Sequence, residues 1–299
     1  MRLGIDLGGT KIEILALNKN GEELYRQRVA TPQNNYPKTL STIRELILTT
    51  EAELGQTGSI GICTPGSLSP DNGLLRNSNS TCLNHKPFKE DLQDLISRDI
   101  RIANDANCFA LSEATDGAAQ NANIVFGVII GTGCGAGIVI NKQIIDGPNS
   151  IAGEWGHNPL PWPEDNEFKS TKCWCGRNDC IETFLSGPGL MNDYKNTAGE
   201  ERNCKEIVQL ATEGNTIARL TLWHYQHRVA KSLAHVINIL DPHIIVLGGG
   251  MSNIEELYTN VPKLWKDYVF SDNVNTRLVA PMHGDSSGVR GAAWLWNNE

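Results

Sequence analysis

Two distant segments of the chain share one pattern, and this repetition constrains the fold more than any other feature of the sequence. Each segment has an apolar stretch, a glycine-rich turn that carries Gly-Thr or Thr-Gly, and a second β-rich stretch; the segments are residues 3–17 and 124–140. The pattern predicts two strands joined by a glycine loop. Their separation of roughly 120 residues far exceeds the period of a solenoid repeat, so we expect a duplicated domain.

Helical and strand signals alternate along the rest of the chain. Hydrophobic periodicity predicts helices over residues 39–54, 88–98, 104–114 and 220–240, and strands over residues 59–63, 100–103 and 243–247. This alternation favours an α/β fold with mixed sheets. In the helix 220–240 we expect Trp223 to face inward together with the aliphatic side chains. A change of composition over residues 114–123 marks the predicted domain boundary.

Charge and hydropathy exclude two classes of partner. The 299 residues carry a formal net charge of −8, which argues against an electrostatic nucleic-acid binder. No stretch approaches the ~20 consecutive apolar residues of a membrane span. The first residues run directly into a predicted strand without the apolar core of a signal peptide, so we expect a soluble cytoplasmic protein.

The first glycine loop, residues 8–11, follows Asp6 and reads Gly8-Gly9-Thr10-Lys11. Glycines in a turn between strands allow backbone N–H groups to approach phosphate oxygens, and Thr10 and Lys11 add further donors. An acid at the end of the strand suits Mg²⁺, so Asp6 is a candidate magnesium residue. Taken alone, the motif is equally compatible with an ordinary glycine hairpin.

The second glycine loop, residues 131–135, lies within Gly-Thr-Gly-Cys-Gly-Ala-Gly. It lacks the Gly-Lys-Ser/Thr of a Walker A loop, and the next residues continue as a strand rather than as a Rossmann helix. Two matched loops, one in each half of the chain, could hold a nucleotide phosphate chain from opposite sides of a cleft. Thr132, Gly133 and Gly135 are therefore candidate phosphate-binding residues.

A further glycine run covers residues 248–250, directly after a buried strand. Gly249 and Gly250 could allow an adenine or ribose to lie against the backbone. A simple turn from strand to helix explains them equally well.

Asn104 and Asp105 stand where a predicted strand meets a predicted helix. A carboxylate at this point can act as a general base, an effect worth ~10²–10⁴-fold in rate. Asn and Asp are also the preferred residues at a helix N-cap, and for this motif alone the cap is the better explanation. The paired glycine loops change the balance, because a phosphoryl-transfer enzyme needs a base of this kind.

Three of the eight cysteines lie close together as Cys173-x-Cys175-x₄-Cys180, with His157 upstream. Three thiolates and one imidazole make a complete tetrahedral set for Zn²⁺, and four protein ligands indicate a structural ion. A redox dithiol or a chance cluster remains open, and spacing alone does not settle His157 as the fourth ligand. The five scattered cysteines are expected to behave as small core residues.

Several of these motifs together resemble the ROK family of sugar kinases and repressors, and most closely its bacterial fructokinase and mannokinase branch. They occupy residues 6–11, 104–107, 131–135, 154–157 and 173–182. The resemblance implies an actin-like, ribonuclease-H-type α/β fold, with ATP and Mg²⁺ in a cleft between two domains. These would be residues 1–118 plus 284–299 and residues 119–283, with the C-terminal helix packed on the first domain. A homodimer is the expectation for such a family.

The resemblance also implies roles for individual residues. Asp105 would be the base that activates the sugar hydroxyl. The residues that would bind the sugar are Gly66, Asn79, Asn104, Asp105, Glu154, His157 and Glu182. The zinc ligands would be His157, Cys173, Cys175 and Cys180. His157 can serve both sites, because one ring nitrogen can bind zinc while the other hydrogen-bonds the sugar.

The expected function is therefore ATP-dependent phosphorylation of a hexose, fructose first and mannose second, at the 6-position. An N-acetylhexosamine or glucose kinase of the same family is the nearest alternative, because residue types do not reveal the accepted sugar. A non-catalytic sugar sensor and an Hsp70-like ATPase are alternatives from other classes. Repressors of the family carry an N-terminal helix-turn-helix, whereas here Met1 directly precedes the first predicted strand, which favours the enzyme.

Overall fold

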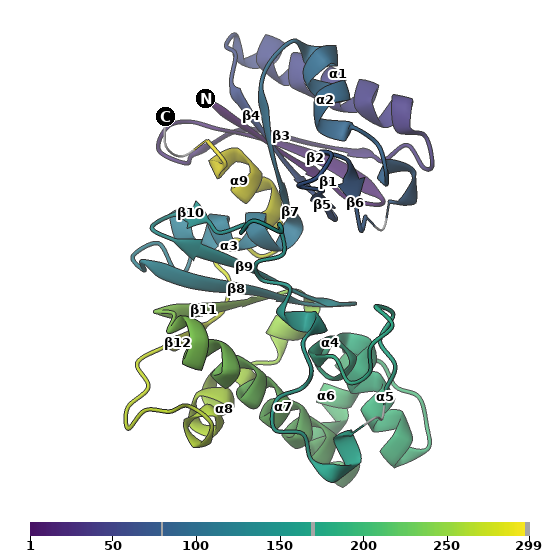
Figure 1. The fold of residues 1–299 in the computed structure, drawn as a ribbon, viewed down its shortest axis with the longest axis vertical. Coiled ribbons are helices and arrows are strands. Elements are labelled where there is room, and N and C mark those ends of the chain that lie inside the picture. The colour runs from purple at the N-terminus through teal and green to yellow at the C-terminus, as the bar shows by residue number, and fades with distance from the viewer. Residues whose placement is uncertain (79, 169–170, 297–299) are drawn as a thin grey trace. The chain divides into compact units, whose positions relative to one another are not determined.

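The computed structural model describes residues 1–78, 80–168 and 171–296 (Figure 1). The chain forms two compact units. The first comprises residues 1–121, 137–152 and 282–299, and the second comprises residues 122–136 and 153–281. The segment 137–152, which the sequence analysis placed in the C-terminal domain, is thus part of the first unit. No helix in the described ranges is both long enough and apolar enough to cross a bilayer.

The first five-stranded sheet has the order β3-β2-β1-β4-β7. Its strands are β1 (Arg2–Leu7), β2 (Lys11–Leu17), β3 (Glu23–Ala30), β4 (Ser59–Thr64) and β7 (Ile100–Asn104). Neighbours β1, β2 and β3 are antiparallel, whereas β1, β4 and β7 run parallel. The central strands are near-continuous runs of buried aliphatic residues, as expected for a sheet covered on both faces.

Helices α1 (Tyr36–Leu54) and α2 (Phe88–Ile96) cover one face of this sheet, and α9 (Ser287–Trp294) covers the other (Figure 1). The approach of α9 requires glycine in the strands. A Cβ at Gly4 would lie 2.0 Å from the carbonyl oxygen of Val289, and one at Gly61 only 1.8 Å from that of Ala292. Helix α3 (Asp105–Thr115) packs on α9. The C-terminal helix therefore packs on the first unit, as expected.

The second sheet has the order β10-β9-β8-β11-β12, which repeats the first sheet strand for strand. Its strands are β8 (Ile124–Ile130), β9 (Cys134–Ile140), β10 (Gln143–Ile144), β11 (Ile244–Gly248) and β12 (Arg277–Val279). In both sheets a glycine loop joins the central strand to its neighbour on one side, and a parallel strand adjoins it on the other. The predicted duplication is confirmed.

Helix α7 (Thr216–Leu240) lies in the middle of the second unit and packs against α4, α5, α6 and α8 (Figure 1). These helices are α4 (Ile181–Leu185), α5 (Gly187–Ala198), α6 (Cys204–Thr212) and α8 (Glu256–Leu264). Trp223 does not face inward as predicted: it is 51% exposed and stacks on His227, with ring centroids 4.1 Å apart. The buried face of α7 passes on either side of this position, through Leu222 and Tyr225.

Short elements complete the described chain. A two-stranded sheet pairs β5 (Ser67–Leu68) with β6 (Leu75–Arg76) in the first unit. The 3₁₀ helices are η1 (Thr81–Leu83), η2 (Trp155–His157), η3 (Asp165–Glu167), η4 (Gly250–Asn253), η5 (Trp265–Asp267) and η6 (Gly284–Ser286). Of these, η2 leads into the predicted metal site.

Candidate functional site

In the first unit, the three parallel strands β1, β4 and β7 end at the same edge of their sheet. Asp6 pairs in register with Cys63, and Thr64 pairs with Asn104. The carboxyl ends of parallel strands are where α/β folds place ligands. The topology therefore brings together the two acids that the sequence analysis selected, Asp6 and Asp105, although 98 residues of chain separate them.

The N-cap of α3 is Asn104, whose Oδ1 accepts the backbone N–H of Asn107 at 2.7 Å. Asp105 is the first residue of the helix, and its Oδ1 accepts the N–H of Ala106 at 2.8 Å. The residue that caps α3 is therefore Asn104 and not Asp105. Asp105 is exposed at the surface. Its position leaves carboxylate lone pairs available to a substrate.

Both acids have raised pKa values. Burial raises the pKa of Asp6 to about 6; a hydrogen bond with the Cys63 thiol opposes this shift, and the charge on Asp105 adds to it. Burial also raises the pKa of Asp105, and its backbone hydrogen bonds oppose this shift. Although part of the residue is exposed to solvent, protein atoms surround the carboxyl group and desolvate it. Neighbouring acids with raised pKa values are typical of sites that bind metals or transfer protons.

The first glycine loop is held by its own backbone and by two polar side chains that follow β3. Gly8 donates its N–H to the carbonyl of Lys11 at 3.0 Å. The hydroxyl of Thr31 donates to the Gly8 carbonyl at 2.7 Å, and Nε2 of Gln33 donates to the Gly9 carbonyl at 2.6 Å. Residues Thr10 and Lys11 are exposed. Hydrogen bonds thus hold the backbone of the loop, while the side chains of Thr10 and Lys11 remain exposed to solvent.

Gly66 follows β4 and adopts φ +86°, a conformation that favours glycine. A Cβ there would lie 2.3 Å from the carbonyl oxygen of Arg76, so no other residue fits without a shift of the backbone. Close packing against residues 76–78 thus accounts for this glycine structurally. Asn79, the other sugar residue expected in this region, lies outside the described residues.

In the second unit, the second glycine loop is held by hydrogen bonds to helical residues. Gly131 donates to the carbonyl of Gly133 at 2.9 Å and accepts from the N–H of Gly187 at 2.8 Å. The N–H of Cys134 donates to Oε2 of Glu182 at 2.9 Å. Thr132 is exposed at the tip of the loop.

The glycines after β11 have different surroundings. Gly249 adopts φ +79°, and a Cβ on it would lie 2.4 Å from the carbonyl oxygen of Ile130. Close packing on β8 thus accounts for this glycine structurally. A Cβ on Gly250 would meet no atom within 4 Å, which leaves the space beside its backbone open.

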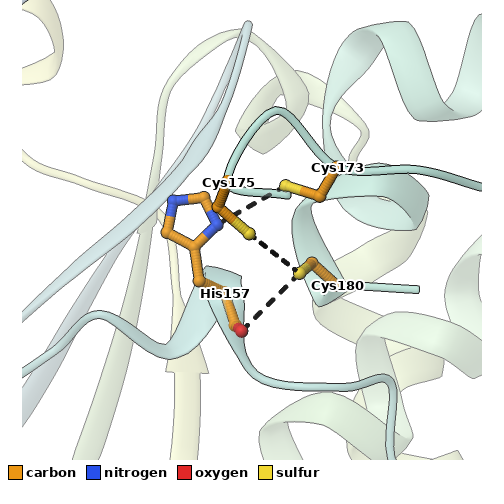
Figure 2. A group of neighbouring side chains, drawn as sticks. All are labelled: His157, Cys173, Cys175 and Cys180. Atoms are coloured by element: carbon orange, nitrogen blue, oxygen red, sulfur yellow. Dashed lines mark hydrogen bonds between the residues drawn. The ribbon is translucent and has the colours of Figure 1, made fainter. Parts of the chain in front are cut away.

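His157, Cys173, Cys175 and Cys180 form one cluster, although His157 comes from η2 and the three cysteines come from residues 173–180 (Figure 2). Their candidate ligand atoms all lie within 4.8 Å of one another. Nδ1 of His157 lies 3.6 Å from Sγ of Cys173, and Sγ of Cys175 lies 3.6 Å from Sγ of Cys180. Ligand bonds of about 2.0 Å to nitrogen and 2.3 Å to sulfur place the corners of a tetrahedron about 3.5–3.8 Å apart. The donor types and their spacing therefore fit a tetrahedral zinc ion.

The distances in this cluster also show that its cysteines do not form a disulfide bond. All eight cysteines, each within the described ranges, are free thiols. A separation of 3.6 Å is well above the ~2.05 Å of a disulfide bond. The second nitrogen of the His157 ring points away from the three sulfurs (Figure 2). That orientation would allow the imidazole to contact both a metal and a substrate.

The two remaining sugar-binding candidates of the second unit, Glu154 and Glu182, adjoin residues of this cluster in the sequence. Glu154 is exposed and immediately precedes η2, which ends at His157. Glu182 is the second residue of α4, which starts directly after Cys180. Its two carboxylate oxygens accept hydrogen bonds from the backbone N–H of Cys134 and from the indole of Trp174.

Several supporting residues were not foreseen from the sequence. Thr31 and Gln33 steady the first glycine loop, and Trp174 contacts Glu182. Glu167 is buried between Arg228 and Lys231, at 2.5 and 2.6 Å, and the ammonium of Lys231 also donates to the carbonyl of Trp162 at 3.0 Å. The sequence signal that could have revealed the Glu167 ion pairs was the presence of Arg228 and Lys231, three residues apart, on an otherwise apolar face of α7.

The comparisons with known proteins agree over the whole chain. The sequence pattern of the ROK family matches residues 2–299. The N-acetyl-D-glucosamine kinase of Vibrio parahaemolyticus serotype O3:K6 is 38% identical over 299 residues, which is 99% of each chain. The N-acetyl-D-glucosamine kinase of Haemophilus influenzae is also 38% identical, over 302 residues and 99% of each chain.

A solved structure gives the same result for the fold. The ROK hexokinase from Thermus thermophilus superimposes with a TM-score of 0.87 and 27% identity, covering 98% of this chain and 96% of that one. The expected actin-like ATPase fold is therefore confirmed. Because the family pattern spans nearly every residue and the structural agreement is of the same extent, the chain belongs to the ROK family.

Proposed function

We propose that the protein transfers the γ-phosphoryl group of ATP to N-acetyl-D-glucosamine. It is an ATP-dependent hexose kinase, and the observation that carries the choice of sugar is the 38% identity, over 99% of both chains, to curated N-acetyl-D-glucosamine kinases. This sugar is the alternative that the motifs leave open. The relatives favour it over fructose and mannose, which the sequence analysis placed first.

Asp105 is the proposed general base. Its carboxylate accepts the proton of the sugar 6-hydroxyl as the new O–P bond forms, and the bond from the γ-phosphorus to the β-γ bridging oxygen breaks to release ADP. The proton then passes from Asp105 to solvent. Burial raises the pKa of Asp105 toward that of an effective base at neutral pH, while Asn104 fixes the start of the helix on which it stands. Transfer to the 6-hydroxyl is inherited from the family resemblance.

Candidate sugar-binding groups are present in each unit, as the family resemblance implies. In the first unit these are the Nδ2 amide of Asn104, whose Oδ1 is already used as a cap, and the backbone of Gly66. In the second unit they are Glu154, His157 and Glu182. Hydrogen bonds to hydroxyl groups select the sugar strongly, because an analogue lacking one leaves a polar group of the protein unpaired. Asn79 remains a candidate from the sequence alone.

The phosphate chain of ATP would be bound by the glycine loops. The N–H groups and exposed side chains of Thr10, Lys11 and Thr132 are the donors available to phosphate oxygens. Gly250 offers open backbone for the nucleoside. A magnesium ion held near Asp6 would neutralise charge on the phosphates.

The cluster of His157, Cys173, Cys175 and Cys180 is the proposed structural zinc site. Four protein ligands leave no open position on the ion, so its role is to hold the loop that carries them. A homodimeric assembly remains a prediction from the family resemblance.

The experiment is a sugar panel with ATP, scored by ADP release. N-acetyl-D-glucosamine, N-acetylmannosamine, glucose, mannose and fructose are compared by kcat/KM. N-acetyl-D-glucosamine should exceed each of the others by at least about tenfold, because glucose, mannose and fructose lack the acetamido group and N-acetylmannosamine presents it with the opposite configuration at C2.

Two other outcomes would overturn the proposed sugar or the proposed activity. A preference for fructose or mannose would overturn the proposed sugar and return to the sequence expectation. Binding of sugar without release of ADP above the ATP-only control would identify a sensor rather than a kinase.

A further inference from the structure

Glu182 joins two parts of the second unit that the sequence analysis treated separately. Its Oε2 accepts the backbone N–H of Cys134 in the second glycine loop at 2.9 Å. Its Oε1 accepts the indole N–H of Trp174 at 2.7 Å, and Trp174 stands between two of the clustered cysteines. Hydrogen bonds to a carboxylate are about twice as strong as neutral ones. One side chain thus connects the glycine loop with the metal loop, residues 173–180.

The glycine loop is shaped to receive this carboxylate. A Cβ on Gly133 would lie 2.6 Å from Oε2 of Glu182, so the carboxylate in its present position lies against a glycine and any larger residue there would displace it. On the opposite side, a Cβ on Gly156 would lie 2.2 Å from the carbonyl oxygen of Cys134. Residue Cys134 is therefore held at its N–H by Glu182 and packed at its carbonyl by the segment that carries His157.

The other end of the connection depends on the metal loop. Trp174 is 75% exposed, so burial does little to fix its indole. Its orientation rests on the hydrogen bond to Glu182 and on an edge contact with the His157 ring, whose centroid lies 5.0 Å away. The residues on both sides of it, Cys173 and Cys175, belong to the cluster. Loss of the metal would free this loop and with it the indole.

We propose that Glu182 is a positioning residue that transmits the state of the metal loop to the second glycine loop and so sets the affinity for the nucleotide phosphates. This inference rests on the proposed function, and it adds a role to the sugar contact expected for Glu182. Each carboxylate oxygen has a second lone pair, so a contact with sugar is compatible with both bonds. The two roles differ in what they predict, since one changes the affinity for sugar and the other changes the affinity for nucleotide.

The test begins with Trp174→Phe, which removes the indole N–H donor and shortens the aromatic side chain. Trp223→Phe is the matched control, because Trp223 is also exposed and lies on α7 against His227. Calorimetry measures the dissociation constants of MgADP and of N-acetyl-D-glucosamine separately. Trp174→Phe should weaken MgADP about tenfold, the order expected for a lost hydrogen bond to a charged group, and leave sugar binding within about twofold. Trp223→Phe should change neither.

Removal of the metal from the wild-type protein with a chelator forms the second arm. It should weaken MgADP at least as much as Trp174→Phe does, and the two changes together should weaken it much less than the product of their separate effects. Independent, multiplying effects would overturn the proposal, as would a Trp174→Phe protein that loses affinity for sugar but not for MgADP.

Hydrogen–deuterium exchange separates failure of this inference from failure of the proposed function. Trp174→Phe and chelation should each speed exchange in residues 131–135 and leave residues 8–11 unchanged, whether or not the protein binds nucleotide. If the wild-type protein binds no nucleotide, the proposed function fails while exchange still tests the connection. Unchanged exchange in residues 131–135 would refute the connection itself.

Discussion

The two glycine loops arise from the same repeated pattern, yet the structure supports them in different ways. The first loop is held by neutral groups from the adjacent strand and the residues after it, with Thr31 and Gln33 donating to the carbonyls of Gly8 and Gly9. The second loop is held by a carboxylate, that of Glu182, which accepts the N–H of Cys134. The hydrogen bonds to the first loop come from residues of the first unit. The second is linked through Trp174 to the metal loop.

This difference shows that a duplicated backbone can carry two kinds of loop. In the first unit the loop lies beside Asp6, the proposed magnesium residue, and Asp105, the proposed base. The side chains that hold this loop, Thr31 and Gln33, are neutral hydrogen-bond donors. In the second unit the loop is held by the carboxylate of Glu182, which is also hydrogen-bonded to Trp174 in the metal loop. We therefore expect substitution of Asp105 in the first unit to affect turnover, whereas perturbation of the metal loop should affect nucleotide binding and local order in the second unit.

The largest effect is expected from Asp105→Asn. The amide cannot accept the hydroxyl proton, so kcat should fall by about 10²–10⁴-fold while the fold and the MgADP affinity are retained. Steady-state kinetics and thermal unfolding measure the two quantities. Asp71→Asn, an exposed acid of the same unit, is the control and should behave as wild type. Turnover close to normal in Asp105→Asn would exclude Asp105 as the base.

Loss of the metal should have the next largest effect, confined to the second unit. Cys175→Ser should release the bound zinc and remove its stabilisation, which is about 2.7 kcal/mol for an ion present at 100 times its dissociation constant. Metal analysis and denaturant unfolding measure the change. Cys82→Ser, a half-buried cysteine outside the cluster, should keep its metal. Unchanged metal content in Cys175→Ser would rule out the zinc site.

A smaller effect is expected from Thr31→Val in the first unit. The substitution keeps the shape of the side chain but removes the hydroxyl that donates to Gly8, a net loss of about 1 kcal/mol. The KM for ATP should rise by about fivefold at most, and exchange should increase in residues 8–11 only. Thr31→Ser retains the donor and should restore the wild-type values. Faster exchange in residues 131–135 would contradict the separation of the two loops.

The smallest effect concerns pH and the packing of α9 in the first unit. Nε2 of His283 lies 3.2 Å from Oδ1 of Asp116, which also pairs with Arg290. The hydrogen bond that the His283 ring donates to the Asp116 carboxylate raises the pKa of His283, with burial acting against it. A raised histidine pKa stabilises the fold fully below the unfolded value of about 6.5, and this contribution is lost as pH rises through the folded pKa.

Denaturant unfolding between pH 5.5 and 8.5 measures this dependence. His283→Gln should flatten the part of the profile that falls as pH rises, whereas His235→Gln in the second unit should leave it unchanged. An unaltered slope in His283→Gln would assign the pH dependence to other groups.

Much of the site could be predicted from the sequence because its signals are local. The Cys173–Cys180 spacing identified the metal cluster, and Asp6 and Asp105 stood at predicted strand ends that proved to share one sheet edge. The supports of the loops could not be predicted in this way. Glu182 contacts Cys134 across 48 residues and Thr31 contacts Gly8 across 23, and no local pattern records such pairs. Trp223 was misplaced because a helical period does not say where the buried face of α7 ends.

The sequence by itself determined the duplicated α/β architecture, the ROK family and the residue types that can hold zinc and transfer a proton. These depend on periodicity and on short motifs, which a chain carries whether or not it is folded. Only the tertiary structure decided that Asn104 rather than Asp105 caps α3, and that Glu182 ties the second glycine loop to the metal loop. The physical reason is that hydrogen bonds and desolvation depend on which distant segments the sheets bring within about 3 Å of one another.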